Sequence, residues 1–358
     1  MRVDNLVIGA GIAGITLARR IAEEKGESVL IVEKRNHIGG YCYDYRSKEG
    51  ILIHKYGPHI FRTEKADIYH FLSRFTDWYD YQHKVLTYVE GQYYPMPINL
   101  DTINQYLNKN FSSEEVLDYF EKVRIPCNSP GNVEEVIESQ VGREFYEKFF
   151  KKYTEKQWGA SPDMLPPEIV ARIPIRTNRD DRYFTCKYQG VPADGYTAMM
   201  QNMLEHKRIS VLLNYNFYEH RDEIEAKNLY CSAPIDEFFE YKFGKLPYRC
   251  VSFQFERHDM KYYQPVSVVN YPNEFDYTRI TEFKHFTKHT SDTTVIAKEI
   301  PSDKGEPSYP IPIKENLELY EQYGELAQER KIHFIGRLGT YRYYSMDQII
   351  ENVQTMPM

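Results

Sequence analysis

Hydrophobic runs and glycines alternate in a regular order over the first forty residues. An apolar run at 3–8 ends at the glycine-rich turn Gly9–Gly14, and apolar residues then recur with helical spacing until about Gly26. A second apolar run at 28–32 ends at Glu33. Short apolar runs on either side of a helical pattern are typical of a β-α-β unit. The pattern therefore predicts a parallel α/β domain at the start of the chain.

The turn at 9–14 reads Gly-Ala-Gly-Ile-Ala-Gly, which is the G-x-G-x-x-G spacing. Glycines permit a tight turn and a close approach of the backbone, so that a pyrophosphate can lie at the N-terminus of the following helix. Glu33 stands 24 positions after Gly9, where an acidic residue accepts hydrogen bonds from ribose hydroxyls. The strands, helix, glycines and acid occur in the required order and together predict a dinucleotide-binding Rossmann-like domain.

A second glycine turn, Gly39–Gly40, follows Glu33. NAD dehydrogenases usually continue into another helix here, whereas FAD proteins similar to glutathione reductase often place a glycine pair that brings the chain close to the flavin. This likeness favours FAD. The glycines at 190–195 do not follow the G-x-G-x-x-G spacing, so the sequence has no evident nicotinamide site, which counts against an ordinary flavin reductase.

The remainder of the chain separates into a helical part and a part rich in strands. A hairpin is predicted at 85–95, and Ser112 opens a helix with a capping box that ends at Glu115. Apolar and polar residues alternate at 251–256. Further strand-like segments follow without helices between them, which predicts an antiparallel sheet. These segments are 265–271, 277–283 and 293–300.

Residues 133–158 form the longest helical pattern. One stripe repeats every four residues and is typical of a buried core. It consists of Val133, Ile137, Val141, Phe145, Phe149 and Tyr153. The adjacent stripe of Phe150, Thr154 and Trp158 fits core packing and a binding face equally well.

The segment 162–182 combines four prolines with four arginines, namely Pro162, Pro166, Pro167, Pro174, Arg172, Arg176, Arg179 and Arg182. Prolines prevent a long helix here. The segment is therefore either a solvated surface loop or a mobile lid whose arginines bind an anion.

Near the C-terminus, the apolar run 332–336 predicts a strand that returns to the first domain. Ser345 and Gln348 form a capping box at the start of a last helix, so its positive end lies close to Arg337 and to the tyrosines at 341, 343 and 344. A flavoprotein can direct such an arginine and helix terminus at the N1–C2 carbonyl edge of an anionic reduced flavin.

The composition argues against nucleic-acid-binding, membrane-spanning and metal-binding proteins. Lys and Arg number 45 and Asp and Glu number 52, a net charge of −7, so the basic face of a nucleic-acid-binding protein is not expected. No apolar stretch reaches 18 residues, so we expect no membrane-spanning segment. We also expect no signal peptide, because the first four residues run directly into a strand-like segment. The five cysteines include no C-x-x-C pair and favour reduced thiols in a cytoplasm. His54 and His59 flank Gly57-Pro58, which would break a helix that aligned them, so no metal site is predicted.

Seven segments, spread in order over almost the whole chain, resemble the bacterial UDP-galactopyranose mutases. They are GAGIAG at 9–14, EKRNHIGG at 33–40, HKYGPHIF at 54–61, YTEKQWG at 153–159, ARIPIR at 171–176, YTRITEFKHF at 277–286 and GRLGTYRYYSMDQ at 336–348. Several of these motifs are peculiar to that family.

The resemblance implies a flavin-dependent, non-redox isomerase that interconverts UDP-galactopyranose and UDP-galactofuranose and supplies galactofuranose for cell-surface glycans. It implies FAD in its reduced form, with flavin N5 attacking the anomeric carbon. We accordingly expect UDP-galactose as substrate, no nucleic-acid partner, and a cytoplasmic homodimer.

The resemblance also assigns roles to individual residues. Arg172 and Arg279 would bind the diphosphate, which is both the leaving group and the returning nucleophile, and would be catalytic together with His59 and Tyr343. The substrate wall would comprise Phe150, Tyr153, Thr154, Trp158, Tyr183, Asn270, Tyr309 and His83. The flavin would contact Gly9, Gly11, Ile12, Ala13, Gly14, Glu33, Lys34, Gly40, Tyr41, His59, Ile60, Phe217, Arg337, Tyr344, Met346 and Asp347.

Two positions depart from the family pattern. Pro58 replaces a common alanine, and Ser345 stands where an aspartate is common, which bears on one polar contact near the flavin or the diphosphate.

Other interpretations of the function stay open. An amine-oxidase-type FAD-dependent oxidoreductase would share the first forty residues, and a non-catalytic nucleotide-sugar-binding module would need neither Glu33 nor the glycine pair. Among mutases, UDP-N-acetylgalactosamine is the alternative substrate.

The expected fold class is α/β, a Rossmann-like FAD-binding domain with an inserted helical domain and an antiparallel β-sheet domain. We expect the FAD-binding domain at 1–80 and 311–358, the helical domain at 96–165, and the sheet domain at 80–95 and 236–310. Residues 166–235 would form the mobile substrate loop and the return to the FAD-binding domain.

Overall fold

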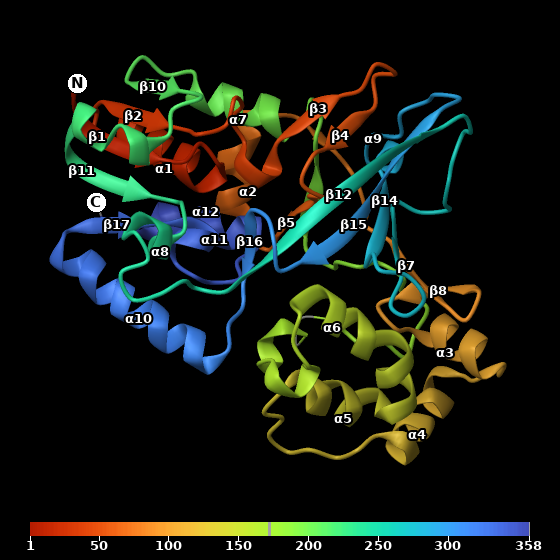
Figure 1. Cartoon of the computed structure of the whole chain (residues 1–358). Coiled ribbons are helices and arrows are strands. Elements are labelled where there is room, and N and C mark those ends of the chain that lie inside the picture. Colours follow the sequence, from red (N-terminus) through yellow and green to blue (C-terminus); the bar gives the residue numbers. More distant parts are fainter. Residues whose placement is uncertain (171–172, 358) are drawn as a thin grey trace. The chain divides into compact units, whose positions relative to one another are not determined.

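The computed structural model describes residues 1–170 and 173–357 (Figure 1). Contacts within the chain divide it into two compact units. The first unit contains Met1–Tyr81, Cys186–Tyr248 and the chain from Glu306 onward, and the second contains Gln82–Thr185 and Arg249–Gly305. The helical segment and the strand-rich segment, expected as separate domains, therefore share one unit.

A parallel sheet with the strand order β10-β2-β1-β11-β17 forms the centre of the first unit. Its strands are β1 (Arg2–Ile8), β2 (Val29–Val32), β10 (Ile209–Leu212), β11 (Glu225–Cys231) and β17 (Ile332–Phe334). All four strand pairs are parallel, as the β-α-β pattern predicts. Every residue of β2 is buried, which explains why it reads as a continuous apolar run and not as an alternating one.

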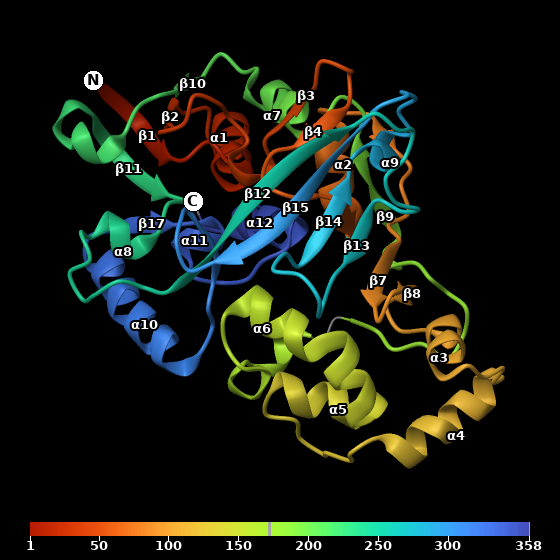
Figure 2. The same cartoon turned by 45° about the vertical axis from the view of Figure 1, so that its right-hand side comes forward.

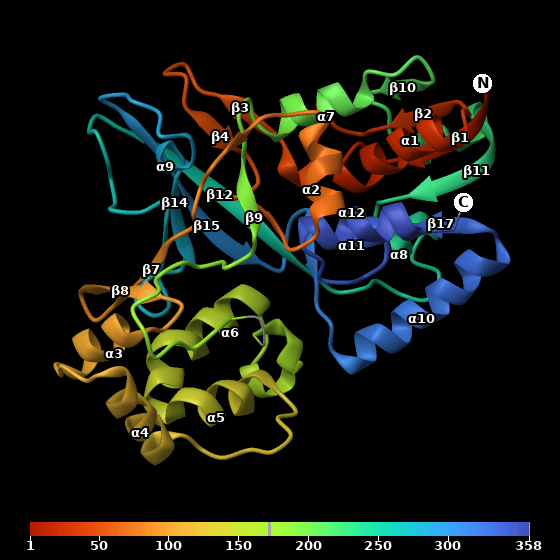
Figure 3. The ribbon, with the colours of Figure 1, turned by 180° about the vertical axis from the view of Figure 1, so that it is seen from behind.

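Helix α1 (Ile12–Glu24) begins directly after the first glycine turn and packs against α7 and α12; Figure 3 shows α12 beneath α1. The other helices of this unit are α2 (Ala66–Ser73), α7 (Tyr196–Leu204), α8 (Ile235–Phe238), α10 (Lys314–Glu329), α11 (Gly336–Gly339) and α12 (Met346–Thr355). The capping box predicted for the last helix is confirmed, because Ser345 N donates to Gln348 Oε1 at 2.9 Å.

Short strands complete the first unit. Strands β3 (Asp44–Arg46) and β4 (Leu52–His54) form a hairpin. A small antiparallel sheet has the order β5-β9-β6, with β5 (Phe61–Thr63), β6 (Trp78–Tyr79) and β9 (Tyr188–Pro192), and β16 (Pro307–Pro310) lies against α11.

The second unit contains a mixed sheet in which β12, β15, β14, β13, β7 and β8 follow one another (Figure 2). Their bounds are β7 (Val85–Val89), β8 (Gln92–Met96), β12 (Tyr248–His258), β13 (Val268–Asn270), β14 (Arg279–Glu282) and β15 (Thr294–Ser302). The predicted hairpin and the antiparallel pairs among the later strands are confirmed. One pair, β13 with β7, is parallel. A long connection separates these two strands, and the alternating pattern carries no information about their relative direction.

The helices of the second unit are α3 (Leu100–Leu107), α4 (Ser113–Val123), α5 (Val133–Phe145), α6 (Lys152–Trp158) and α9 (Lys284–Thr287). The helical segment predicted at 133–158 is present but interrupted: Gly142 has φ 79° and ψ 174°, and a π-helical segment, Tyr146–Lys151, separates α5 from α6. A Cβ at Gly142 would lie 2.4 Å from Val123 O, so the glycine lets α5 pack against the end of α4. The core stripe is buried as predicted as far as Phe149, and Tyr153 is partly exposed.

Candidate functional site

Two glycine turns of the first unit pack against each other beyond the carboxyl ends of β1 and β2. Gly11 and Gly39 form a β-bridge. A Cβ on Gly40 would lie 3.0 Å from Gly11 Cα, and a Cβ on Gly14 would lie 2.1 Å from Gly9 O. The second glycine pair therefore lets the two turns meet, and Gly14 lets α1 start directly on the first turn.

The N-terminus of α1 lies at these turns. The first intrahelical hydrogen bond runs from Ile15 N to Gly11 O at 3.0 Å, so the N–H groups of residues 12–14 have no partner within the helix. Gly11 provides no capping side chain, and no acidic residue stands in the first turn of this helix. Free N–H groups and the helix dipole together favour a phosphate at this position.

Glu33 follows β2 and is only 3% exposed. Its Oε2 accepts a hydrogen bond from Ala10 N at 3.0 Å, and its Oε1 accepts one from Arg35 N at 2.9 Å. Arg35 Nη1 also donates to Oε1, at 3.4 Å, whereas Oε2 keeps a second lone pair. Glu33 can therefore hold the glycine turn and still accept from a ribose hydroxyl.

A cavity of about 200 Å³ lies beside the turns, within the first unit. The predicted flavin-contacting residues that line it are Gly9, Gly11, Ile12, Ala13, Glu33, Lys34, Gly40, Tyr41, His59, Phe217, Arg337 and Met346. Gly14, Ile60, Tyr344 and Asp347 are not among its lining residues. The cavity also has wall residues that the sequence did not indicate, including Tyr215, Asn216 and Tyr218 around Phe217 after β10, and residues 232–234 after β11. Loops at the carboxyl edge of a parallel sheet are where ligands bind, so identifying these two strands would have indicated both walls.

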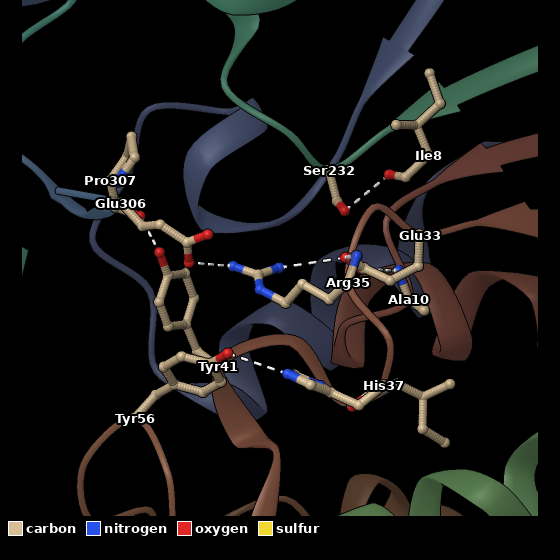
Figure 4. Close-up of polar contacts among 11 residues, drawn as sticks. Ile8, Ala10, Glu33, Arg35, His37, Tyr41, Tyr56, Ser232, Glu306 and Pro307 are labelled. Carbon is tan, nitrogen blue, oxygen red and sulfur yellow. Dashed lines mark hydrogen bonds and ion pairs between the residues drawn. The ribbon is translucent and has the colours of Figure 1, made fainter. Parts of the chain in front are cut away.

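Arg35 joins two walls of this cavity (Figure 4). Its Nη2 donates to Glu306 Oε2 at 2.7 Å, and its Nη1 lies 3.4 Å from Glu33 Oε1. The guanidinium carbon lies 5.6 Å from the centre of the Tyr41 ring, and the Tyr41 hydroxyl donates to Pro307 O. Although burial opposes the charge, Glu306 and Glu33 raise the pKa of Arg35. The sequence motif extends to Glu33 but gives no sign of the contact between Arg35 and Glu306.

Arg337 lies between two predicted substrate residues of the first unit. Its guanidinium carbon is 4.9 Å from the ring centre of Tyr309 and 5.4 Å from that of Tyr343. Its Nη2 donates to Tyr344 O at 2.9 Å, whereas its Nε is buried and has no hydrogen-bond partner in the described part of the chain. A buried donor without an acceptor is costly, so Arg337 fits a bound group that presents an acceptor to the cavity.

His59 lines the cavity as a neutral imidazole. Burial, followed by the nearby His54 and Arg337, lowers the pKa of His59 to about 3. Its Nδ1 lies 2.8 Å from Gly57 O, which can only accept, so the hydrogen-bond network places the proton on Nδ1. Nε2 is therefore the ring atom available as an acceptor.

In the second unit, three strands align Asn270, Arg279 and Glu299 as cross-strand neighbours. Arg279 Nη2 donates to the Tyr153 hydroxyl at 2.6 Å, and Arg279 Nε lies 3.4 Å from Glu299 Oε2. The Glu299 side chain is 4% exposed; burial raises its pKa, and the charge of Arg279 opposes that shift. Arg279 is thus fixed both by the sheet and by α6.

The other predicted substrate residues of the second unit are mostly buried. Phe150, Thr154 and Trp158 are 4%, 4% and 6% exposed, so they pack in the core, and their contact with substrate stays a prediction. His83 O accepts from Tyr183 N at 2.7 Å, and the two rings meet edge to face. Burial lowers the pKa of His83 to about 3, which leaves its imidazole neutral.

Three of the four arginines in the proline-rich segment contact the protein's own acceptors. The contacts are Arg176 with Asp180 O and Arg182 O, Arg179 with Asp101, and Arg182 with Asp180. Arg172, which we predict to bind the diphosphate, lies outside the described residues. The lid itself stays a prediction.

The cavity suits a dinucleotide on the evidence of its own atoms. The helix terminus and paired turns provide backbone donors for a pyrophosphate, Glu33 provides acceptors for a ribose, and Arg337 provides an unused donor. Within residues 1–170 and 173–357, no group of His, Cys, Asp or Glu has the three members that a metal ion would need. Among the helices described, none is both long and apolar enough to cross a membrane.

Similar proteins were found by family model, by sequence and by fold. The family model described as UDP-galactopyranose mutase matches residues 148–343, and a model described as NAD(P)-binding Rossmann-like domain matches residues 7–75. A relative from Klebsiella pneumoniae, named probable UDP-galactopyranose mutase, is 40% identical over 96% of this chain and 91% of its own length. A dTDP-fucopyranose mutase from Escherichia coli is 38% identical over 97% of this chain and 95% of its own length. The fold matches a crystal structure of reduced UDP-galactopyranose mutase with a TM-score of 0.80 at 17% identity, over 99% of this chain and 92% of that one.

Proposed function

The chain belongs to the UDP-galactopyranose mutase family, and on this premise we propose that it interconverts UDP-galactopyranose and UDP-galactofuranose with FAD in its reduced form. The observation that carries the proposal is the cavity with paired glycine turns at one end and the unused donor of Arg337 in its wall. An amine-oxidase-type oxidoreductase would share the glycine motif, but the two full-length relatives at 40% and 38% identity are both named as mutases.

The residues that would hold FAD all belong to the first unit. The N–H groups at the start of α1 would bind the pyrophosphate, and Glu33 would accept from the adenosine ribose. Arg337 would donate to the flavin. When bound, reduced FAD supplies a nucleophilic nitrogen, N5, for the anomeric carbon of the sugar.

Arg279 is the residue of the second unit that we assign to the diphosphate. Negative charge grows on the diphosphate as the bond to the anomeric carbon breaks, so a guanidinium binds it more tightly in the transition state than in the substrate. The hydroxyl of Tyr153 and the carboxylate of Glu299 hold that guanidinium in place. Arg172 is proposed as the second diphosphate ligand on the resemblance of its motif.

His59 is proposed to orient the sugar without carrying charge. Because Nδ1 donates to Gly57 O, Nε2 can accept from a sugar hydroxyl. With a pKa near 3 the ring stays neutral across the physiological range, so it adds no positive charge beside Arg337.

A second candidate substrate, dTDP-fucopyranose, is favoured by the relative that is 38% identical and carries that name. The two substrates differ in the base methyl group, the ribose 2′-hydroxyl and the sugar 6-hydroxyl. They share the hexopyranose ring and the diphosphate, so the roles of Arg279 and the cavity are the same for both. We also propose a homodimer, which light scattering of the purified protein tests.

The test is incubation of the purified protein with UDP-galactose or dTDP-fucose, with and without dithionite, followed by chromatography of the nucleotide sugars. We expect the furanose of the UDP-sugar to form only with reduced protein and without stoichiometric use of reductant. Equal rates for oxidised and reduced protein would contradict the flavin role. If the protein converts dTDP-fucose and not UDP-galactose, then dTDP-fucopyranose is its substrate.

A further inference from the structure

One lysine attaches α6 to the connection between β13 and β14. The Nζ of Lys156 donates to the backbone oxygens of Tyr271, Phe275 and Tyr277 at 2.5, 2.9 and 3.1 Å. An ammonium has three N–H donors and no acceptor, so these three oxygens satisfy it completely. The connection begins after Asn270 at the end of β13 and ends at Arg279 at the start of β14.

Helix α6 also contacts the side chain of Arg279. Tyr153 stands three residues before Lys156, and its hydroxyl accepts from Arg279 Nη2 at 2.6 Å. Helix α6 therefore contacts this part of the sheet at two places within the second unit. Lys156 binds the connection before β14, and Tyr153 binds Arg279, the first residue of β14. Arg249 holds the end of the helix, because its Nη2 donates to Lys156 O at 2.8 Å and its Nε to Gln157 O at 3.2 Å.

We propose that Lys156 is a positioning residue for nucleotide-sugar binding: it fixes the β13–β14 connection to α6 and thereby sets the Tyr153–Arg279 pair in the arrangement that receives the diphosphate. This role rests on the proposed function of the same site. No contact of Lys156 with the substrate is required, since it acts through Arg279 and Tyr153.

The charge state of Lys156 makes the proposed role depend on pH, which a measurement of UDP binding can detect. Burial lowers the pKa of Lys156 to about 8; Glu274 and Asp276 on the connection favour its charge, and Lys152 on its own helix opposes it. The guanidinium of Arg249 of β12 donates to the backbone oxygen of Lys156 from the strand side. A neutral amine has two N–H groups, so one of the three carbonyl oxygens loses its donor as the pH rises through about 8.

The experiment compares the holoenzyme with the variants Lys156→Met, Lys156→Arg and Lys152→Met. Lys152 is exposed on the same helix, so its replacement removes an equal charge without touching the connection. Isothermal titration gives the Kd for UDP at pH 7 and pH 9, turnover gives KM and kcat, and absorbance gives the flavin content.

In the wild type we expect the Kd for UDP to rise about fivefold between pH 7 and pH 9. Lys156→Met should raise Kd and KM about tenfold at pH 7, the lower end of the effect of losing a hydrogen bond to a charged group, and should change little further at pH 9. Because the variant keeps Arg279, which still stabilises the charge of the diphosphate in the transition state, kcat should fall less than KM rises. Lys156→Arg keeps its charge and should bind UDP equally at both pH values, whereas Lys152→Met should follow the wild type.

The positioning role is wrong if Lys156→Met binds UDP as the wild type does. If that variant does not fold, the test uses Lys156→Arg. The role is contradicted if the Kd of Lys156→Arg for UDP rises between pH 7 and pH 9 as much as the Kd of the wild type does. A wild type that binds neither UDP nor dTDP would overturn the proposed function itself, and the two failures are therefore distinguishable.

Discussion

Each of the two units carries candidate binding residues of its own, and the two sets differ in whether the backbone or the side chains provide the contacts. In the first unit the backbone forms much of the site, with Gly14 and Gly40 where a Cβ would collide and helix N–H groups where a phosphate would lie. In the second unit side chains form it, with Arg279 held by Tyr153 and Glu299 and α6 held by Lys156. A backbone site tolerates no added atom, whereas a side-chain site responds to charge, geometry and pH.

The largest effect should come from adding one methyl group to the backbone site. A Cβ on Gly14 would lie 2.1 Å from Gly9 O, so Gly14→Ala must push α1 away from the turn. Losing two hydrogen bonds to charged phosphates would lower flavin affinity at least about 10²-fold. Flavin absorbance of the purified variant measures this loss.

The matched control is Gly324→Ala in α10, where a Cβ meets nothing within 4 Å. Alanine should stabilise that helix by about 0.5–1 kcal/mol and leave the flavin content unchanged. Normal flavin binding in Gly14→Ala would show that the turn can move without cost.

In the side-chain site, Arg279→Ala should lower kcat at least about 10²-fold, the scale of a lost transition-state donor. Arg279→Lys should fail as well, because an ammonium cannot donate to Tyr153 and bind a diphosphate in the same forked geometry. Flavin content should stay normal in both variants. Arg257, exposed on β12 of the same unit, provides the control, and Arg257→Ala should turn over at the wild-type rate. A fully active Arg279→Lys variant would contradict the fixed geometry.

A smaller effect is expected where the first unit itself uses a side-chain contact. Glu306→Gln removes the partner of Arg35, but the Glu306 side chain is 50% exposed and solvent screens the pair. FAD affinity should fall about three- to fivefold, which corresponds to about 0.6–1 kcal/mol. Fluorescence titration at low and high salt measures it, and salt should weaken the wild type towards the variant. If the wild type and Glu306→Gln show the same salt dependence, the contact between Arg35 and Glu306 does not contribute to FAD binding.

The last effect concerns the pH dependence of stability and not ligand binding. His54 is 1% exposed, and burial lowers its pKa to about 3. The unfolded chain takes up a proton below about pH 6.5 while the folded protein does not, so stability is present above pH 6.5 and is lost as the pH falls towards 3. His54→Asn should reduce the slope of the unfolding free energy by at most about 1.4 kcal/mol per pH unit. Urea unfolding at pH 5, 6 and 7 measures both slopes, and identical slopes would show that His54 is protonated in the folded protein.

The features predictable from sequence are those whose cause is local. The glycine motif, the hairpin at 85–95 and the capping box at Ser345 each depend on residues a few positions apart, and all three are present. The kink at Gly142 depends on the backbone of Val123 in another helix, and so the apolar period of the stripe did not reveal it.

Contacts between distant residues explain the remaining gaps. Arg35 and Glu306 are 271 positions apart, and no spacing rule connects them. Lys156 binds backbone oxygens, which every residue possesses, so no residue type in the sequence identifies its partners. Arg279, by contrast, was predicted from a motif, and its role still awaits the measurements above.

The walls of the cavity come from stretches that lie far apart in the order of synthesis, since Gly9 and Ile349 are 340 positions apart. During translation the glycine turns emerge early but have no opposite wall until the segment from Glu306 has left the ribosome. A nascent chain that lacks the segment from Glu306 therefore cannot enclose a bound nucleotide, and loading becomes a step that follows synthesis of that second wall.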